Sequence, residues 1–254
     1  MPETTRHYGR PPRPVIEPTL LTLVRHGQTT GNVRKLLSGV SDDPLTSFGR
    51  RQAAAMGNAL SALILDGSLP PVHALYVSPL QRARHTAAAL AQTLGLTPVL
   101  RDDLMEINFG ELEGMTEDEA VARYPDAPIA QRNNWFTMEY TFPGGESRRG
   151  FHQRSKDALG EIVANHPGEH VIVVAHGGVL GIVLAHYLTG NTERWRDYIL
   201  TNCSISRLTV QGDDVTLHAV NDVAHLAEIT PEEAETASAI MEHEHEHEGD
   251  AARD

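Results

Sequence analysis

Residues 20–32, LLTLVRHGQTTGN, decide the fold of this chain. The stretch begins with apolar residues typical of a buried strand and passes directly into Arg25, His26 and Gly27. A cation and an ionisable ring are costly to bury without partners, so the core strand has to end where they stand. The stretch therefore predicts a buried strand over 20–24 that holds polar groups at its carboxyl end.

Outward from this stretch, helical and extended patterns alternate along the chain. Apolar residues at helical spacing predict helices over 47–65 (capped by Thr46 or Ser47), 80–95, 150–167 and 178–190. Apolar runs and turn residues predict strands over 72–78, 97–100 and 170–176, and a closing hairpin over 205–220 around the turn GDD. Such alternation predicts the α/β class, as a three-layer α/β/α sandwich on a mostly parallel sheet. An acidic, irregular segment around EINFGELEG follows the strand over 97–100, and residues 117–140, which contain Pro125 and Pro128, predict an excursion over one face.

Charge and composition set the domain organisation. With 254 residues, 40% of them hydrophobic, the chain is expected to form one large domain over 19–227. A Pro- and Arg-rich lead-in over 1–18 is expected to be disordered, and 228–254 reads as an acidic, His- and Glu-rich tail. This tail holds ten acids and one base, so it carries nine of the thirteen net negative charges. The body shows no basic stripe, which argues against a nucleic-acid partner.

The sequence also predicts the cellular compartment of the protein. The longest apolar runs are interrupted within about ten residues, short of the roughly 18 that span a bilayer, so no membrane association is expected. The lead-in has no apolar signal core, and the single cysteine, Cys203, excludes an intramolecular disulfide. We therefore expect a cytoplasmic protein, and the sequence leaves a homo-oligomer open.

Polar residues gather at the carboxyl ends of three predicted strands. They are Arg25, His26 and Gly27 after the first, Ser78 and the following Arg82 after the second, and His176, Gly177 and Gly178 after the strand over 170–176. Ligands of open α/β sheets bind beyond these ends, and a helix starting near Gly178 would offer free N–H groups. The pattern predicts a site for a phosphate-sized anion.

Two histidines and two arginines, without an obvious serine or cysteine nucleophile, suggest a mechanism. A neutral imidazole attacks phosphorus well, and guanidinium groups stabilise the phosphoryl oxygens. A carboxylic acid must then protonate the leaving alcohol and later activate water. From position alone, the candidates for that acid are Glu106, Glu111 and Glu113.

The motifs occur in a familiar order over about residues 20–227. They are LVRHGQTTGN, GVSDDPLTSFGRRQA, SPLQRARHTA, EINFGELEG, PGGES and VVAHGG. Together they resemble the histidine phosphatase superfamily, in its phosphoglycerate mutase-like branch. The resemblance implies the phosphoglycerate mutase-like fold, a phosphohistidine intermediate, a small phosphorylated metabolite as partner, and neither a cofactor nor a metal.

The resemblance also implies roles residue by residue. His26 matches the phosphorylated nucleophile, Arg25 and Arg82 the phosphate-binding arginines, His176 the second histidine and Glu106 the general acid and base. The expected substrate contacts are Arg25, Gly27, Asn32, Arg82, His176 and Gly177. Gln28, Gly31 and Leu36 depart from common family residues, and Leu36 stands where many relatives carry an arginine.

Three functions follow from these matches. Because only Arg123 and Arg132 lie between Glu106 and Gly144, and FGELEG resembles the phosphatase members, hydrolysis of small organic phosphate esters is favoured. A cofactor-dependent phosphoglycerate mutase is the alternative, and a non-catalytic phospho-ligand-binding module is a third. The aromatic residues Trp135, Phe136, Tyr140 and Phe142 form either a lid or a packed excursion.

One tail motif suggests a competing metal site. Residues 243–247, HEHEH, fit the H-E-x-x-H zinc pattern. No apolar face follows them to build a closed site, so a solvated acidic extension is the favoured interpretation.

Overall fold

The computed structural model describes residues 16–125 and 138–230. The strands are β1 (Thr19–Arg25), β2 (Val72–Val77), β3 (Val99–Leu100), β4 (His170–Ala175), β5 (Ile205–Gln211) and β6 (Asp214–Asp222). The α-helices are α1 (Thr30–Arg34), α2 (Ser47–Leu65), α3 (Gln81–Leu94), α4 (Glu117–Arg123), α5 (Arg148–Asn165) and α6 (Gly177–Thr189). Short 3₁₀ segments are η1 (Asp102–Leu104), η2 (Gly110–Leu112), η3 (Thr192–Tyr198) and η4 (Ala224–Leu226).

The described strands form one sheet in the order β3-β2-β4-β1-β5-β6. The first four strands of this order are parallel, and β5 runs antiparallel to both β1 and β6. The central strands β1 and β4 are flanked on both edges, which explains why their sequences are almost continuously apolar. The mostly parallel sheet confirms the predicted class.

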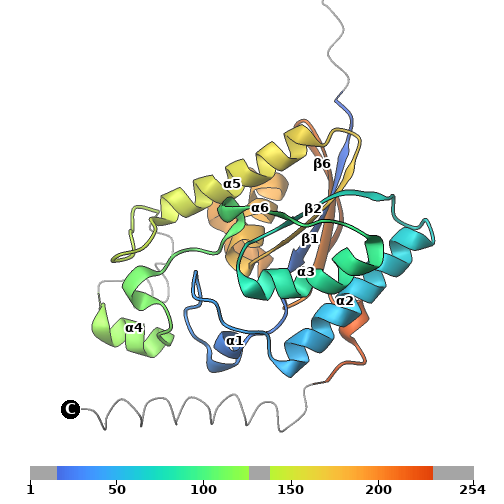
Figure 1. Ribbon diagram of the computed structural model, residues 1–254. Coiled ribbons are helices and arrows are strands. Elements are labelled where there is room, and N and C mark those ends of the chain that lie inside the picture. Colours follow the sequence, from blue (N-terminus) through green and yellow to red (C-terminus); the bar gives the residue numbers. More distant parts are fainter. Residues whose placement is uncertain (1–15, 126–137, 231–254) are drawn as a thin grey trace, which may run out of the picture.

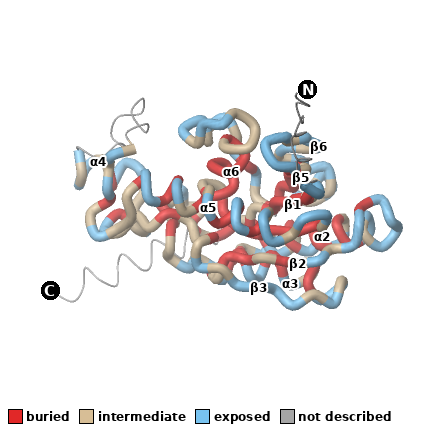
Figure 2. Tube along the Cα trace, turned by 90° about the horizontal axis from the view of Figure 1, so that it is seen from above, coloured by how far each residue is buried: buried red, intermediate tan, exposed pale blue. Residues whose placement is uncertain are grey.

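Helices cover both faces of the sheet, as Figure 1 shows. Alternate residues of β4 point to opposite faces: Val171 and Val173 pack in the core under α5 and α6, and Ile172 and Val174 pack in the core under α2 and α3. Buried residues concentrate along the central strands between these layers (Figure 2). The predicted α/β/α sandwich is therefore confirmed.

Local details differ from the sequence predictions at several ends. Thr46, rather than Ser47, caps α2, because its side chain accepts the Gly49 N–H. The strand predicted over 97–100 shrinks to two exposed residues at the edge of the sheet, where only one neighbour is present to pair with it. The helix predicted from 150 begins at Arg148, because Ser147 caps it.

The excursion predicted over 117–140 begins with the short helix α4. Thr116 and Glu119 form a capping box that starts α4, and the helix ends at Arg123, before Pro125. Trp135 and Phe136 lie outside the described residues, as do the lead-in to residue 15 and the HEHEH motif. Within the described ranges, no helix has the length and apolar character that a bilayer crossing requires.

Candidate active site

Strand register brings the two histidines together. Arg25 of β1 pairs with Ala175 of β4, so His26 and His176 leave the sheet side by side at its carboxyl edge. Their ring centroids are 5.2 Å apart, and the rings are tilted by 57°. Residues 150 positions apart in sequence thus share one site because two parallel strands end at the same level.

The His26 ring is held in one tautomer. Its Nδ1 lies 2.8 Å from the carbonyl oxygen of Gly27, which can only accept, so Nδ1 carries the proton and Nε2 keeps a lone pair. Burial, and then the positive charges of Arg25 and Arg82, hold the pKa of His26 well below its ordinary value of 6.5. The ring is therefore neutral at physiological pH, as an imidazole nucleophile must be.

Arg82 is almost completely buried and is fixed by backbone oxygens. Its terminal nitrogens donate to the carbonyls of Ser41 and Gly39, both at 2.5 Å. Its Nε donates to Nδ1 of His176 at 3.2 Å, and Nε2 of His176 lies 2.7 Å from the Ser78 hydroxyl. Both ring nitrogens of His176 therefore have protein partners, and this ring orients Arg82 towards the site.

Arg25 extends from the end of β1 into the same region. One terminal nitrogen donates to the carbonyl of Leu200 at 2.5 Å. Its Nε is buried and has no hydrogen-bond partner among the described residues. An anion in the site would supply the missing acceptor.

Glu106 lies against the start of α6. Its carboxylate accepts the Gly178 N–H at 2.8 Å and the Ile107 N–H at 3.1 Å. Burial raises the pKa of Glu106 above its ordinary value of 4.5, and these two hydrogen bonds partly oppose the rise. A Cβ at position 178 would stand 2.4 Å from the carboxylate Oε1, so a larger residue there would displace the Glu106 carboxylate from this position. The N–H group expected to be free for a ligand is instead occupied by Glu106.

The other two candidate acids lie elsewhere. Glu111 accepts a hydrogen bond from the Tyr124 hydroxyl, away from the cavity. Glu113 accepts three successive N–H groups from residues 39–41, and so fixes the loop whose carbonyls hold Arg82. Of the three acids, Glu106 alone borders the cavity.

Asn32 is oriented by a residue that the sequence reading missed. Its Oδ1 accepts the Thr29 N–H and one N–H of the Asn202 amide, both at 3.1 Å. Asn202 also donates to the His26 carbonyl at 2.9 Å. The acceptor atom of Asn32 is thus occupied, which leaves its NH₂ group for a ligand.

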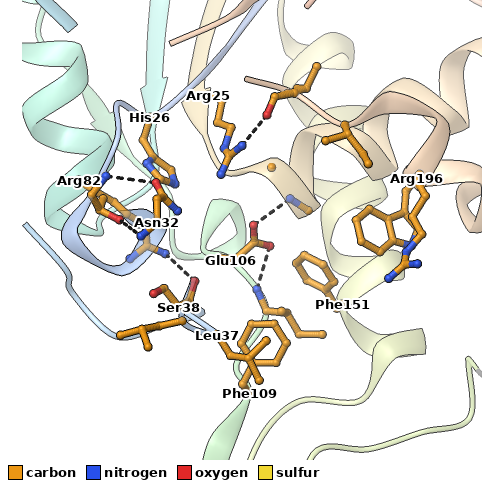
Figure 3. Close-up of a pocket in the computed structure, with 18 of the residues that line it drawn as sticks. Arg25, His26, Asn32, Leu37, Ser38, Arg82, Glu106, Phe109, Phe151 and Arg196 are labelled. Atoms are coloured by element: carbon orange, nitrogen blue, oxygen red, sulfur yellow. Dashed lines mark hydrogen bonds between the residues drawn. The ribbon is translucent and has the colours of Figure 1, made fainter. Parts of the chain in front are cut away.

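These residues surround a cavity of about 500 Å³, shown in Figure 3. Of the predicted site residues, the cavity is bordered by Arg25, His26, Asn32, Arg82, Glu106 and Gly177. Gly27 and His176 do not border it, and the Gly27 N–H donates to the Thr86 hydroxyl. Direct substrate contact by these two residues stays a prediction. Leu36 lines the cavity and contributes an apolar side chain to its wall.

Three further basic side chains line the cavity without having been predicted. They are Arg148 and His152 of α5 and Arg196 of η3. The first two stand four residues apart on one helix, a spacing that places both on the same face and could have identified them. No comparable sequence pattern indicates Arg196, because it lies in the 3₁₀ segment η3, between α6 and β5. Among the described residues, no group of three or more His, Cys, Asp or Glu side chains lies together to hold a metal.

Comparison with known proteins finds similar chains and similar structures. A metal-independent phosphoserine phosphatase of Arabidopsis thaliana is 32% identical over 214 residues, which cover 84% of this chain and 85% of the relative. A probable phosphoglycerate mutase GpmB of Cronobacter sakazakii is 30% identical over 215 residues, 80% of this chain and 93% of the relative. The solved structure of Bacillus stearothermophilus YhfR matches with a TM-score of 0.70 at 30% identity, covering 82% of this chain and 99% of that one.

The family match itself spans residues 21–223, from β1 through β6. It therefore includes every residue placed around the cavity above. Because the match covers most of the chain, the family assignment does not rest on a single motif. The chain belongs to the histidine phosphatase superfamily, branch 1.

Proposed function

We propose that this protein hydrolyses small organic phosphate monoesters through a phosphohistidine intermediate on His26, without a metal ion. The observation that carries the proposal is the neutral His26 ring, whose Nδ1 is engaged by Gly27 while the residue borders a cavity with Arg25 and Arg82. The substrate is a small phosphorylated metabolite, and the protein acts in the cytoplasm.

In the first step, Nε2 of His26 attacks phosphorus and the bond from phosphorus to the alcohol oxygen breaks. Arg25 and Arg82 stabilise the charge on the phosphoryl oxygens, and the Asn32 NH₂ group adds a donor. Glu106 enters this step protonated and gives its proton to the leaving oxygen. The raised pKa of Glu106 supports this role.

In the second step, a water molecule attacks the phosphohistidine. The Glu106 carboxylate accepts a proton from this water while the bond between nitrogen and phosphorus breaks. Inorganic phosphate leaves, His26 is neutral again and Glu106 is protonated for the next turnover. The same residue thus serves as acid and then as base.

Hydrolysis of 4-nitrophenyl phosphate in the presence of EDTA tests the proposal directly. We expect release of inorganic phosphate at a rate that EDTA does not lower, because the proposed steps use only side chains. The control adds Mg²⁺ or Zn²⁺ to protein treated with EDTA. An activity that appears only after metal is restored would refute the metal-independent mechanism.

The proposed roles predict a bell-shaped pH profile on the acidic side of neutrality. His26 must be neutral, so kcat/KM rises as pH increases through its pKa, which lies below 6.5. Glu106 must be protonated, so kcat/KM falls as pH increases through its pKa, which lies above 4.5. Ionisation of the substrate phosphate also changes kcat/KM with pH, and it does so for both phenyl and 4-nitrophenyl phosphate. A difference between the pH profiles of the two esters therefore isolates the contribution of Glu106. The Glu106 limb is expected for phenyl phosphate alone, because nitrophenolate leaves without a proton; identical profiles would contradict the assignment.

A phosphoglycerate mutase is the second candidate, favoured by the cations at the far end of the cavity. A mutase must hold a second anionic group of its substrate, and Arg148 and Arg196 border the cavity although the segment after Glu106 offers few cations. Interconversion of 2- and 3-phosphoglycerate, measured beside phosphate release from the same substrates, decides between the two. Faster interconversion than release would favour the mutase.

A further inference from the structure

The far end of the cavity contains a second group of polar side chains. In Figure 3, Arg196 lies on the opposite side from His26 and Arg82, with Glu106 and Phe151 drawn between them. Arg148 and His152 border the same cavity from α5. The cavity therefore carries positive charge at two separated places, of which the proposed mechanism uses one.

Arg148 and Arg196 form a pair of like charges in a desolvated setting. Arg148 is 4% exposed, and burial together with the charge of Arg196 lowers the pKa of its guanidinium to about 10. Glu193 opposes this shift, and Glu117 acts in the same way on Arg196, but neither outweighs the cost of burial. Both arginines remain charged at neutral pH, and an anion between them would offset their repulsion.

His152 adds a buried hydrogen-bonding atom that has no partner among the described residues. Its side chain is 4% exposed, and among the described residues nothing hydrogen-bonds to its Nδ1. Burial and the charge of Arg148 lower the pKa of His152 to about 4, so the ring is neutral. A buried polar atom without a partner is rare in folded proteins, and a bound group would satisfy it.

Apolar side chains also line the cavity, and Figure 3 draws one of them, Phe151, between its two polar ends. Phe109, Phe151 and Trp195 line the cavity, together with Leu36. A volume of about 500 Å³ falls within the range of pockets that enclose whole organic ligands. The cavity thus offers a phosphate site, an apolar middle and a cationic far end.

We propose that Arg148, Arg196 and His152 form a second anion subsite, so that preferred substrates carry a carboxylate or second phosphate-class group joined to the ester by an apolar or aromatic spacer. Guanidinium forks bind both oxyanions in the same two-point manner. This inference rests on the proposed hydrolase function, and it names the class of ester that the enzyme prefers.

Three matched esters test the subsite. They are phenyl phosphates whose para position carries, through a short alkyl chain, a carboxamide, a carboxylate or a phosphonate. We expect kcat/KM to be about tenfold higher for at least one anionic ester than for the neutral amide, since hydrogen bonds to charged groups are worth that much. The better of the two anions identifies the group that the subsite prefers.

Variants connect this preference with the named residues. Arg196→Gln and Arg148→Gln should each remove most of the preference for the anionic ester, as a ratio of kcat/KM values. Arg194→Gln is the matched control, because Arg194 lies in the same 3₁₀ segment, pairs with Asp197 and does not border the cavity. Because Arg148 is buried, its replacement can also destabilise the fold, and thermal unfolding of each variant shows whether it folds. Arg196 is less buried, so Arg196→Gln tests the subsite with a smaller effect on stability.

The outcomes separate this inference from the proposed function. If the wild-type protein hydrolyses all three esters equally, or if Arg194→Gln lowers the preference as much as Arg196→Gln, the second subsite is refuted while the hydrolase function stands. If the wild-type protein hydrolyses none of them, the proposed function itself fails. A preference that Arg196→Gln abolishes and Arg194→Gln keeps supports the subsite.

Discussion

Replacing His26 with alanine is expected to lower kcat/KM for 4-nitrophenyl phosphate by at least about 10⁴-fold, the scale of loss when a nucleophile is removed. The alanine variant has no atom that can form the covalent intermediate, and water at the vacated position is a poorer, unoriented nucleophile. Steady-state kinetics measures this loss. Rapid quenching in alkali of wild-type protein mixed with labelled substrate should also show acid-labile phosphate on the protein, and the variant should show none.

Two controls distinguish loss of the nucleophile from loss of the fold. His85→Ala changes an exposed histidine of α3 and should keep its activity within about twofold, as surface substitutions usually do. The His26→Ala protein should still bind inorganic phosphate, detected as a rise in its unfolding temperature, because Arg25 and Arg82 remain. An alanine variant with undiminished turnover would contradict the mechanism. A wild-type protein that binds phosphate but hydrolyses no ester would instead favour the binding-module alternative.

Glu106→Gln is expected to have an effect that depends on the leaving group. For an alkyl phosphate, whose alkoxide needs a proton to leave, kcat/KM should fall about 10²–10⁴-fold, the usual contribution of general acid catalysis. For 4-nitrophenyl phosphate the first step needs no proton, so its kcat/KM should change little. The second step still needs a base, and the phosphohistidine should therefore accumulate.

Rapid-mixing kinetics checks this accumulation. We expect a burst of nitrophenol that matches the concentration of Glu106→Gln enzyme, followed by slow turnover. Glu111→Gln is the matched control, since Glu111 lies five residues further on but outside the cavity, and it should behave like the wild type. An equal loss for alkyl and aryl esters, without a burst, would show that Glu106 positions the site rather than transferring protons.

The sequence determined the architecture because its strongest signals are local or repeated. The apolar run before Arg25 and the apolar run over 171–175 indicated central strands, and the helical spacing over 47–65 indicated a helix that covers a face of the sheet. Parallel strands that end together also bring His26 and His176 to one edge, so their proximity followed from the alternating pattern. The sequence prediction was less accurate where few contacts support an element: the strand predicted over 97–100 contains only the two residues of β3.

Only the tertiary structure decided what each polar residue faces. Spacing could not separate Glu106 from Glu111 and Glu113, because all three lie in one irregular segment whose path is set by long-range contacts. The contact of Glu106 with Gly178 joins residues 72 positions apart. Arg196 reaches the cavity for the same reason, since a 3₁₀ segment packed beside α6 carries it there. The sequence thus specified the end of the cavity where we propose that phosphate binds, because its motifs are attached to strands. Only the fold showed that Arg196 joins Arg148 and His152 at the end where we propose that the rest of the substrate is selected.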